Sequence, residues 1–172
     1  MNIEFKTITE SEKTIFENLF NYYLCELSLY SLEEVGPDGK YEMEDIPQYY
    51  IDDRLFPYLI TVDNNVAGFI LVVSPPYVSE GIDYSVQELF VLPKYRGTGI
   101  AKKATMHIFK QFKGHYNIGM FRTNTRAVNF WTHLLSSLDV DVQIDADSFV
   151  KIAGNELPVM DISFSISEKA DL

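Results

Sequence analysis

The 172-residue chain contains a single cysteine, Cys25, so it cannot form an internal disulfide. So little cysteine is typical of a reducing compartment, and we expect a cytoplasmic protein. No apolar run approaches the roughly 18 residues that a membrane helix needs. Residues 1–13 carry scattered charges and no apolar segment, unlike a signal peptide. These absences argue against a disulfide scaffold and predict no membrane partner.

The composition is that of a folded protein, with 47% hydrophobic and 14% aromatic residues. A chain of this length can bury about 70% of its unfolded surface, so it needs no metal to fold, and we expect none in its site. The length falls within the range of one compact domain, and we expect residues 1–172 to form a single one.

Acidic residues are plentiful in this chain, whose net charge is −11, yet they are missing from one long stretch. An acidic protein is a poor partner for nucleic acid, so we expect none. Residues 89–138 contain no Asp or Glu but hold eight basic residues: Lys94, Arg96, Lys102, Lys103, Lys110, Lys113, Arg122 and Arg126. Either this is an accident of surface composition, or the stretch forms a site for a polyanion.

Hydrophobic periodicity indicates strands and helices in turn along the chain. Thr9 and Glu12 fit a capping box before one helix, and Asn124 can cap another. The patterns predict strands over residues 2–8, 58–62, 66–73, 82–92, 116–121, 140–149 and 157–166, and helices over residues 10–29, 47–55, 100–112 and 124 to 135 or 138. Interleaved strands and helices predict a three-layer α/β or α+β domain with a mixed sheet.

A glycine-rich turn, residues 96–101, lies between a predicted strand and a predicted helix. Free N–H groups and the helix dipole favour an anion at such a helix start, and Gly97 and Gly99 allow its close approach. A tight turn alone is the simpler interpretation. A P-loop is excluded because no Gly-Lys-Ser/Thr follows. A dinucleotide turn is disfavoured because Lys102 takes the third glycine position and no acidic residue follows in the stretch.

The turn matches a different pattern in full, Arg/Gln-x-x-Gly-x-Gly/Ala, from Arg96 to Ala101. With residues 88–95 before it and the later Asn124-x-x-Ala-x-x-aromatic segment, the sequence resembles the GNAT family, the Gcn5-related N-acetyltransferases. The resemblance implies a three-layer GNAT-like fold with a mixed, mostly antiparallel central sheet and helices on both faces. It also implies an acyltransferase that moves an acetyl group from acetyl-CoA, its co-substrate, to a primary amine by direct attack in a ternary complex.

The resemblance further implies how acetyl-CoA is held. The main chain of the turn would bind the pyrophosphate, the strand before it would pair with the pantetheine arm beside a bulge, and Asn124 would bind the arm from the other side. The expected cofactor-binding residues are Leu89, Phe90, Val91, Arg96, Gly97, Thr98, Gly99, Ile100, Ala101, Lys102, Asn124 and Trp131. Three phosphates on the ligand would explain the acid-free stretch.

The reaction needs a base for the ammonium and donors for the oxyanion. Glu88 lies nearest the expected thioester and is the candidate catalytic base, unless it is only a surface or salt-bridged acid. Trp131 stands where many family members carry a tyrosine as acid for the leaving thiolate. Either the thiolate leaves unassisted, another hydroxyl helps, or Trp131 only packs against the cofactor. The candidate replacement hydroxyls are those of Tyr84, Tyr95 and Tyr116.

No motif identifies the acceptor. Residues 33–56 crowd acidic and aromatic side chains, namely Glu33, Glu34, Asp38, Glu42, Glu44, Asp45, Asp52, Asp53, Tyr41, Tyr49, Tyr50 and Phe56. Acidic residues attract cations and aromatic rings cradle them, so we expect a cationic small-molecule or peptide amine, unless this is only a solvated face. The alternative function is a non-catalytic acyl-CoA-binding or sensor protein of the same fold, and a homodimer is left open.

Overall fold

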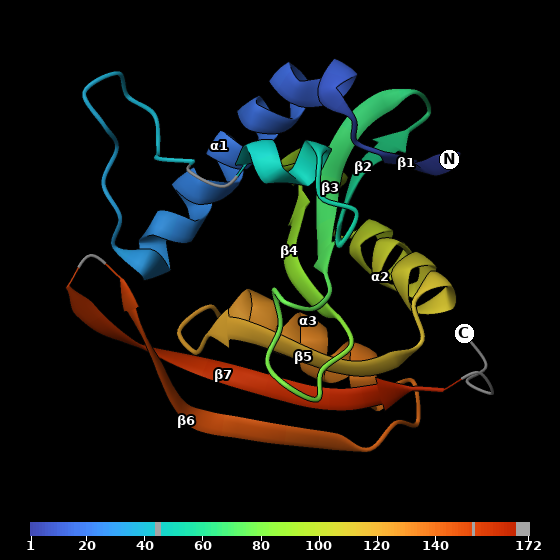
Figure 1. The fold of residues 1–172 in the computed structure, drawn as a ribbon. Coiled ribbons are helices and arrows are strands. Elements are labelled where there is room, and N and C mark those ends of the chain that lie inside the picture. The colour runs from blue at the N-terminus through green and yellow to red at the C-terminus, as the bar shows by residue number, and fades with distance from the viewer. Residues whose placement is uncertain (44–45, 153, 168–172) are drawn as a thin grey trace.

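The computed structural model describes residues 1–43, 46–152 and 154–167 (Figure 1). Its strands are β1 (Ile3–Thr7), β2 (Leu55–Val62), β3 (Asn65–Val73), β4 (Ser85–Val91), β5 (Gly114–Phe121), β6 (Val142–Ile152) and β7 (Asn155–Ile166). Its α-helices are α1 (Lys13–Ser31), α2 (Ile100–Gln111) and α3 (Thr125–Ser136), with short 3₁₀ helices at Glu10–Glu12, Ile46–Tyr50 and Pro93–Tyr95. This order confirms the interleaved arrangement predicted from the sequence. None of the described helices is long and apolar enough to span a membrane.

Two antiparallel sheets meet at one point. Strands β1-β2-β3-β4 form the first sheet and β5-β7-β6 the second. A single parallel bridge between Tyr84 and Tyr116 joins them within the described residues, and beyond it β4 and β5 diverge (Figure 1). The predicted mixed, mostly antiparallel sheet is therefore confirmed, and its two halves open like a V.

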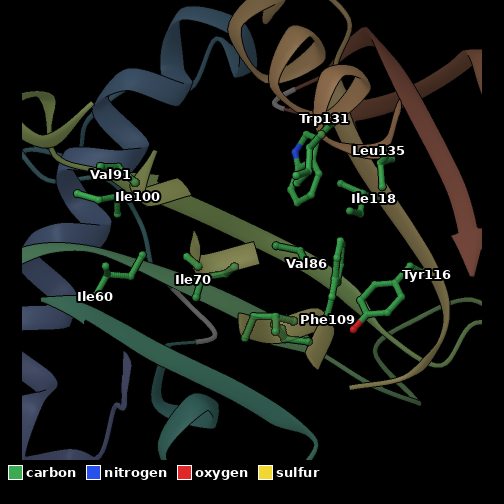
Figure 2. Packing of buried hydrophobic residues seen from close by; sticks show 14 of the residues in the cluster. Ile60, Ile70, Val86, Val91, Ile100, Phe109, Tyr116, Ile118, Trp131 and Leu135 are labelled. Atoms are coloured by element: carbon green, nitrogen blue, oxygen red, sulfur yellow. The ribbon is translucent and has the colours of Figure 1, made fainter. Parts of the chain in front are cut away.

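The helices cover opposite faces because successive side chains of β3 alternate in direction. Phe69 and Leu71 pack with Phe16 and Leu19 of α1 on one face. The residues between them, such as Ile70, lie on the other face of β3 and pack in a cluster with side chains of α2, β5 and the inner side of α3 (Figure 2). The buried strand thus carries a near-continuous apolar run, which is the pattern expected when both faces are covered.

Local signals set the helix starts well. The Glu12 carboxylate accepts a hydrogen bond from the Thr9 N–H at 3.0 Å, as the predicted capping box requires. The predicted helix over residues 47–55 is wrong beyond its first turn, because a 3₁₀ helix ends at Tyr50 and β2 already begins at Leu55. Leu55 is buried and pairs with Val73, so sheet pairing decides its conformation.

Candidate active site

A cavity of about 860 Å³ opens where β4 and β5 part. Its wall comes from the C-terminal half of α1, the end of β4, the glycine turn, the first residues of α2, and α3. Its volume suits a cofactor-sized ligand, and most of its lining is apolar. The end of β4 that has separated from β5 therefore borders a cavity that also reaches the glycine turn.

The glycine turn presents free main-chain donors to this cavity. Gly97 and Gly99 have φ of 74° and 82°, a left-handed backbone that glycine adopts without strain. The first helical bond of α2 runs from the Lys103 N–H to the Gly99 carbonyl at 3.0 Å. The N–H groups of Ile100, Ala101 and Lys102 precede this bond, so the helix provides no carbonyl for them and they suit an anion.

Arg96 connects the glycine turn to β4 and α1 through hydrogen bonds. Its Nε donates to the Val91 carbonyl at 2.7 Å, and its Nη2 donates to Oε1 of Glu26 on α1 at 2.7 Å. The second carboxylate oxygen of Glu26 lies 3.6 Å from Nη1 of Arg126. Arg96 lines the cavity, as expected of a cofactor-binding residue, but protein acceptors already hold its guanidinium.

Only part of the acid-free stretch faces the cavity. Of its eight basic residues, Arg96, Lys102 and Arg126 are on the wall, while the others lie elsewhere on the surface. The candidate polyanion site is thus narrower than the charge count suggests, and Lys102 and Arg126 are its accessible cations. Thr98 is not on the wall; its hydroxyl donates to the Tyr95 carbonyl at 2.6 Å and stabilises the turn.

Helix α3 supplies the opposite wall. Asn124 caps it by accepting a hydrogen bond from the Ala127 N–H at 3.2 Å, and its side chain borders the cavity. Trp131 is 5% exposed and projects from α3 toward Ile118 and Val86 (Figure 2). The structure thereby places Asn124 and Trp131 on the wall of the same cavity as the turn.

Strand β4 forms the floor through Leu89, Phe90 and Val91, all three on the wall. The bulge expected beside these residues lies earlier. Leu71 pairs with Glu88 and Val72 with Val86, so Gln87 is the extra residue. The expectation of a bulge at residues 89–91 is therefore wrong, because these residues keep regular pairing with β3. The other edge of this segment faces the cavity, since β5 has already diverged.

Glu88 does not lie on the cavity wall; its part-buried carboxylate accepts a hydrogen bond from the Tyr23 hydroxyl of α1. Burial raises the pKa of Glu88 to about 7, although the hydrogen bond from Tyr23 acts in the opposite direction. Burial, and then the negative charge at Glu88, raises the pKa of Tyr23 well above its usual value. Glu88 therefore titrates near neutral pH, as a catalytic base requires.

Tyr23 is the residue that sequence reasoning missed. It lines the cavity together with Glu26, Leu27 and Tyr30, at the i, i+3, i+4 and i+7 positions of one helical face. That spacing was present in the sequence, but it equally fits a core-facing stripe.

The three tyrosines considered as the acid in place of Trp131 lie in different surroundings. Tyr116 is fully buried and donates to the Phe112 carbonyl at 2.8 Å, and Tyr84 packs against Tyr116 outside the cavity. Tyr95 does border the cavity. Two of the three are thus packing residues.

The acidic and aromatic residues that follow α1 do not all lie on one surface. Asp52 pairs with Arg54 at 2.6 Å, and Phe56 packs on Phe112 across the sheet from α1. Tyr49 instead donates to Gln87, next to Glu88. Phe56 therefore takes no part in an aromatic cradle, whereas Tyr49 stands close to the candidate base. Glu44 and Asp45 lie outside the described residues.

Comparison with known proteins decides the family. The family model for the acetyltransferase (GNAT) family matches residues 17–135, which include most of α1, the glycine turn and nearly all of α3. The chain belongs to the GNAT acetyltransferase family. Among curated proteins, the sequence comparison finds no match.

Solved structures of GNAT acetyltransferases share the fold. A probable acetyltransferase from Staphylococcus epidermidis has a TM-score of 0.67 at 14% identity, over 96% of this chain and 100% of that one. Spermidine N-acetyltransferase from Vibrio cholerae, in complex with CoA and spermine, has a TM-score of 0.64 at 15% identity, over 96% of both chains. NAA60 from Arabidopsis thaliana, in complex with a bisubstrate analogue, has a TM-score of 0.64 at 16% identity, over 95% and 98%. These likenesses show that this GNAT chain has the GNAT fold.

Proposed function

We propose that this GNAT protein is an acetyl-CoA-dependent N-acetyltransferase that acetylates a primary amine by direct attack. The observation that carries the proposal is one cavity lined both by a turn suited to an anion and by Tyr23, whose hydroxyl donates to Glu88 behind the wall. This arrangement joins cofactor recognition and a titratable base within one site. The family membership supports an acyl donor of the CoA type.

The cavity suits both halves of acetyl-CoA. The N–H groups of Ile100, Ala101 and Lys102 and the cations of Lys102 and Arg126 would hold its phosphates. The free edge of β4 at residues 89–91 would hydrogen-bond the amides of the pantetheine arm, and Trp131 would pack against it. Bound acetyl-CoA supplies an activated thioester carbonyl.

Glu88 would then accept the proton of the incoming ammonium. An alkylammonium has a pKa of about 10, so a carboxylate with a pKa of about 7 is a far better acceptor than an ordinary glutamate. The surface pair of Asp52 and Arg54, for comparison, has no comparable role because it lies away from the cavity.

A cationic acceptor is the class that the surroundings favour. The negative charge at Glu33 acts on the Tyr23 hydroxyl, and Tyr49 borders the same end of β4. Acidic and aromatic side chains near the Tyr23–Glu88 pair attract an amine cation. The Vibrio cholerae spermidine N-acetyltransferase, which is similar in fold, has a structure in complex with CoA and spermine, which makes polyamines the first acceptors to test.

A panel assay tests this function. Purified protein and acetyl-CoA are incubated with polyamines, aminoglycosides and peptides with a free N-terminus or lysine, and CoA release is measured. Release above the hydrolysis rate with at least one amine is expected. In a parallel binding assay, acetyl-CoA and CoA should raise the melting temperature of the protein, and NAD should not. Binding without release on any amine would instead favour the non-catalytic acyl-CoA-binding protein, for which Trp131 in place of a hydroxyl is the supporting observation.

A further inference from the structure

We infer that Tyr23 is a catalytic residue that donates a proton to the departing CoA thiolate, and that Glu88 restores the proton to Tyr23. The inference rests on the proposed acetyl transfer and adds a second catalytic group to it. Tyr23 has no counterpart in the residues that the sequence motifs identified.

The position of Tyr23 carries the argument. Its side chain borders the cavity, whereas Glu88 is not among the described residues on the wall. The Tyr23 hydroxyl donates to the Glu88 carboxylate, so the phenol lies between the acid and the cavity. A proton that leaves Glu88 for the cavity therefore has the Tyr23 oxygen as its nearest path.

Other hydroxyls on the wall lack such a partner. Ser137 donates to the Leu134 carbonyl at 2.7 Å, Tyr30 stacks on Phe121, and Tyr95 lies beside the ammonium of Lys94. Among the described hydroxyl groups of the cavity, only Tyr23 bonds to a carboxylate. It is therefore the hydroxyl whose proton can be replaced in each turnover.

The surroundings keep Tyr23 in place and protonated. Its ring packs against Phe20, Phe69 and Phe90, with centroids 5.6–6.0 Å away. The charged and titratable groups that act on its hydroxyl are Glu88 of β4, Tyr49 of the 3₁₀ helix and Glu33 after α1. All three oppose a phenolate, so the phenol stays a donor throughout neutral pH.

The proposed step conserves atoms and protons. The neutral amine nitrogen forms a bond to the thioester carbonyl carbon, and the C–S bond breaks with its electron pair going to sulfur. Glu88 already holds the proton of the ammonium, received through the Tyr23 hydroxyl that separates it from the cavity, and the second proton released from the nitrogen goes to water. Tyr23 gives its phenolic proton to the thiolate and takes the proton held by Glu88. One of the two ammonium protons thus passes from nitrogen to sulfur and the other to water, and no oxidant or reductant is needed.

The test compares Tyr23→Phe with the control Tyr22→Phe, since Tyr22 is the next residue of α1, 60% exposed and outside the cavity. Both variants should remain folded, and Tyr22→Phe should melt like wild type. We expect Tyr23→Phe to lower kcat about tenfold to a hundredfold, with the acetyl-CoA KM nearly unchanged, and Tyr22→Phe to change neither. In the ligand-free protein, the Glu88 pKa followed by carboxyl ¹³C NMR should rise in Tyr23→Phe, because a hydrogen bond to the carboxylate is lost.

A double variant separates a shared proton path from two independent contributions. Tyr23→Phe combined with Glu88→Gln should be no slower than Glu88→Gln alone, because the path is already cut. If the two losses in kcat multiply, the role of Tyr23 is overturned and the proposed function stands. The same holds if the wild type is active and Tyr23→Phe keeps full kcat. A wild type that acetylates no amine would overturn the proposed function, and this inference with it.

Discussion

Nη2 of Arg96 in the glycine turn lies 2.7 Å from Oε1 of Glu26 on α1, which places a carboxylate on the wall of a cavity suited to phosphates. Both side chains are part-exposed, so this pair contributes at most about 1 kcal/mol to stability. Its main effect is electrostatic: Glu26 offsets the positive charge of Arg96 and Arg126 at the candidate cofactor site.

Replacing Glu26 by glutamine should therefore tighten cofactor binding. We expect acetyl-CoA to bind Glu26→Gln about twofold to fivefold more tightly at low salt, with little change in melting temperature. Isothermal titration calorimetry measures this. Glu17→Gln is the control, because Glu17 lies on the same helix, pairs with Lys13 and is not on the cavity wall. Weaker binding by Glu26→Gln alone would mean that the clamp on Arg96 matters more than the charge.

The glycine turn should not tolerate an acidic side chain. Gly99→Glu puts a carboxylate at the start of α2 and forces a left-handed backbone on a residue with a Cβ, at a cost of roughly 1–2 kcal/mol. We expect acetyl-CoA binding to be lost in a thermal-shift titration. Gly81→Glu is the matched control, since Gly81 has φ of 83°, has open space around it and lies outside the cavity. It should lose similar stability and keep binding; equal affinity in both variants would contradict the assignment of the turn.

Salt dependence should reveal which cations meet the phosphates. Lys102→Ala should weaken acetyl-CoA binding about threefold to tenfold at low ionic strength and flatten its dependence on salt, because screening then has less charge to act on. Lys110→Ala, on the same helix but off the wall, should leave both quantities unchanged. Affinity measured between 50 and 500 mM salt, roughly spanning Debye lengths of 14 to 4 Å, provides the comparison.

Glu88 should control both rate and stability with pH. The rate should rise through a pKa of about 7, and Glu88→Gln should lower kcat by roughly 10²–10⁴ while leaving acetyl-CoA affinity unchanged. Because the folded pKa lies above the ordinary value of 4.5, the native state holds the extra proton between these values. Its stability contribution is therefore present below about pH 4.5 and lost as pH rises to 7.

The stability part of this prediction needs no substrate. In Glu88→Gln, the change in the free energy of unfolding between pH 4.5 and 7 should be smaller than in the wild type, by up to about 3 kcal/mol. Urea melts at several pH values measure it, with Glu10→Gln, a surface acid, as control. If Glu88→Gln keeps full activity, another group is the base. If the free energy of unfolding depends on pH in the same way in Glu88→Gln as in the wild type, burial does not raise the pKa of Glu88.

Short-range patterns in the sequence were sufficient for the glycine turn, the Asn124 cap, the Thr9 capping box and the order of the elements. Each depends on a few neighbouring residues whose backbone preferences or hydrogen bonds act locally. The turn motif also indicated the family, because Arg96, Gly99 and Ala101 have the spacing of the family's motif at a helix start that can face an anion.

The tertiary structure alone decided which distant residues meet. Packing α1 on β3 and β4 sets Tyr23 against Glu88, 65 residues away, and sets Glu26 against Arg96, 70 residues away. It also placed the bulge at Gln87 and turned Phe56 to the opposite face of the sheet. Such contacts depend on how whole faces pack and on strand register, and a change of one residue in register reverses every side chain. A pattern read along the chain can indicate that a tyrosine faces inward, but not which carboxylate it reaches.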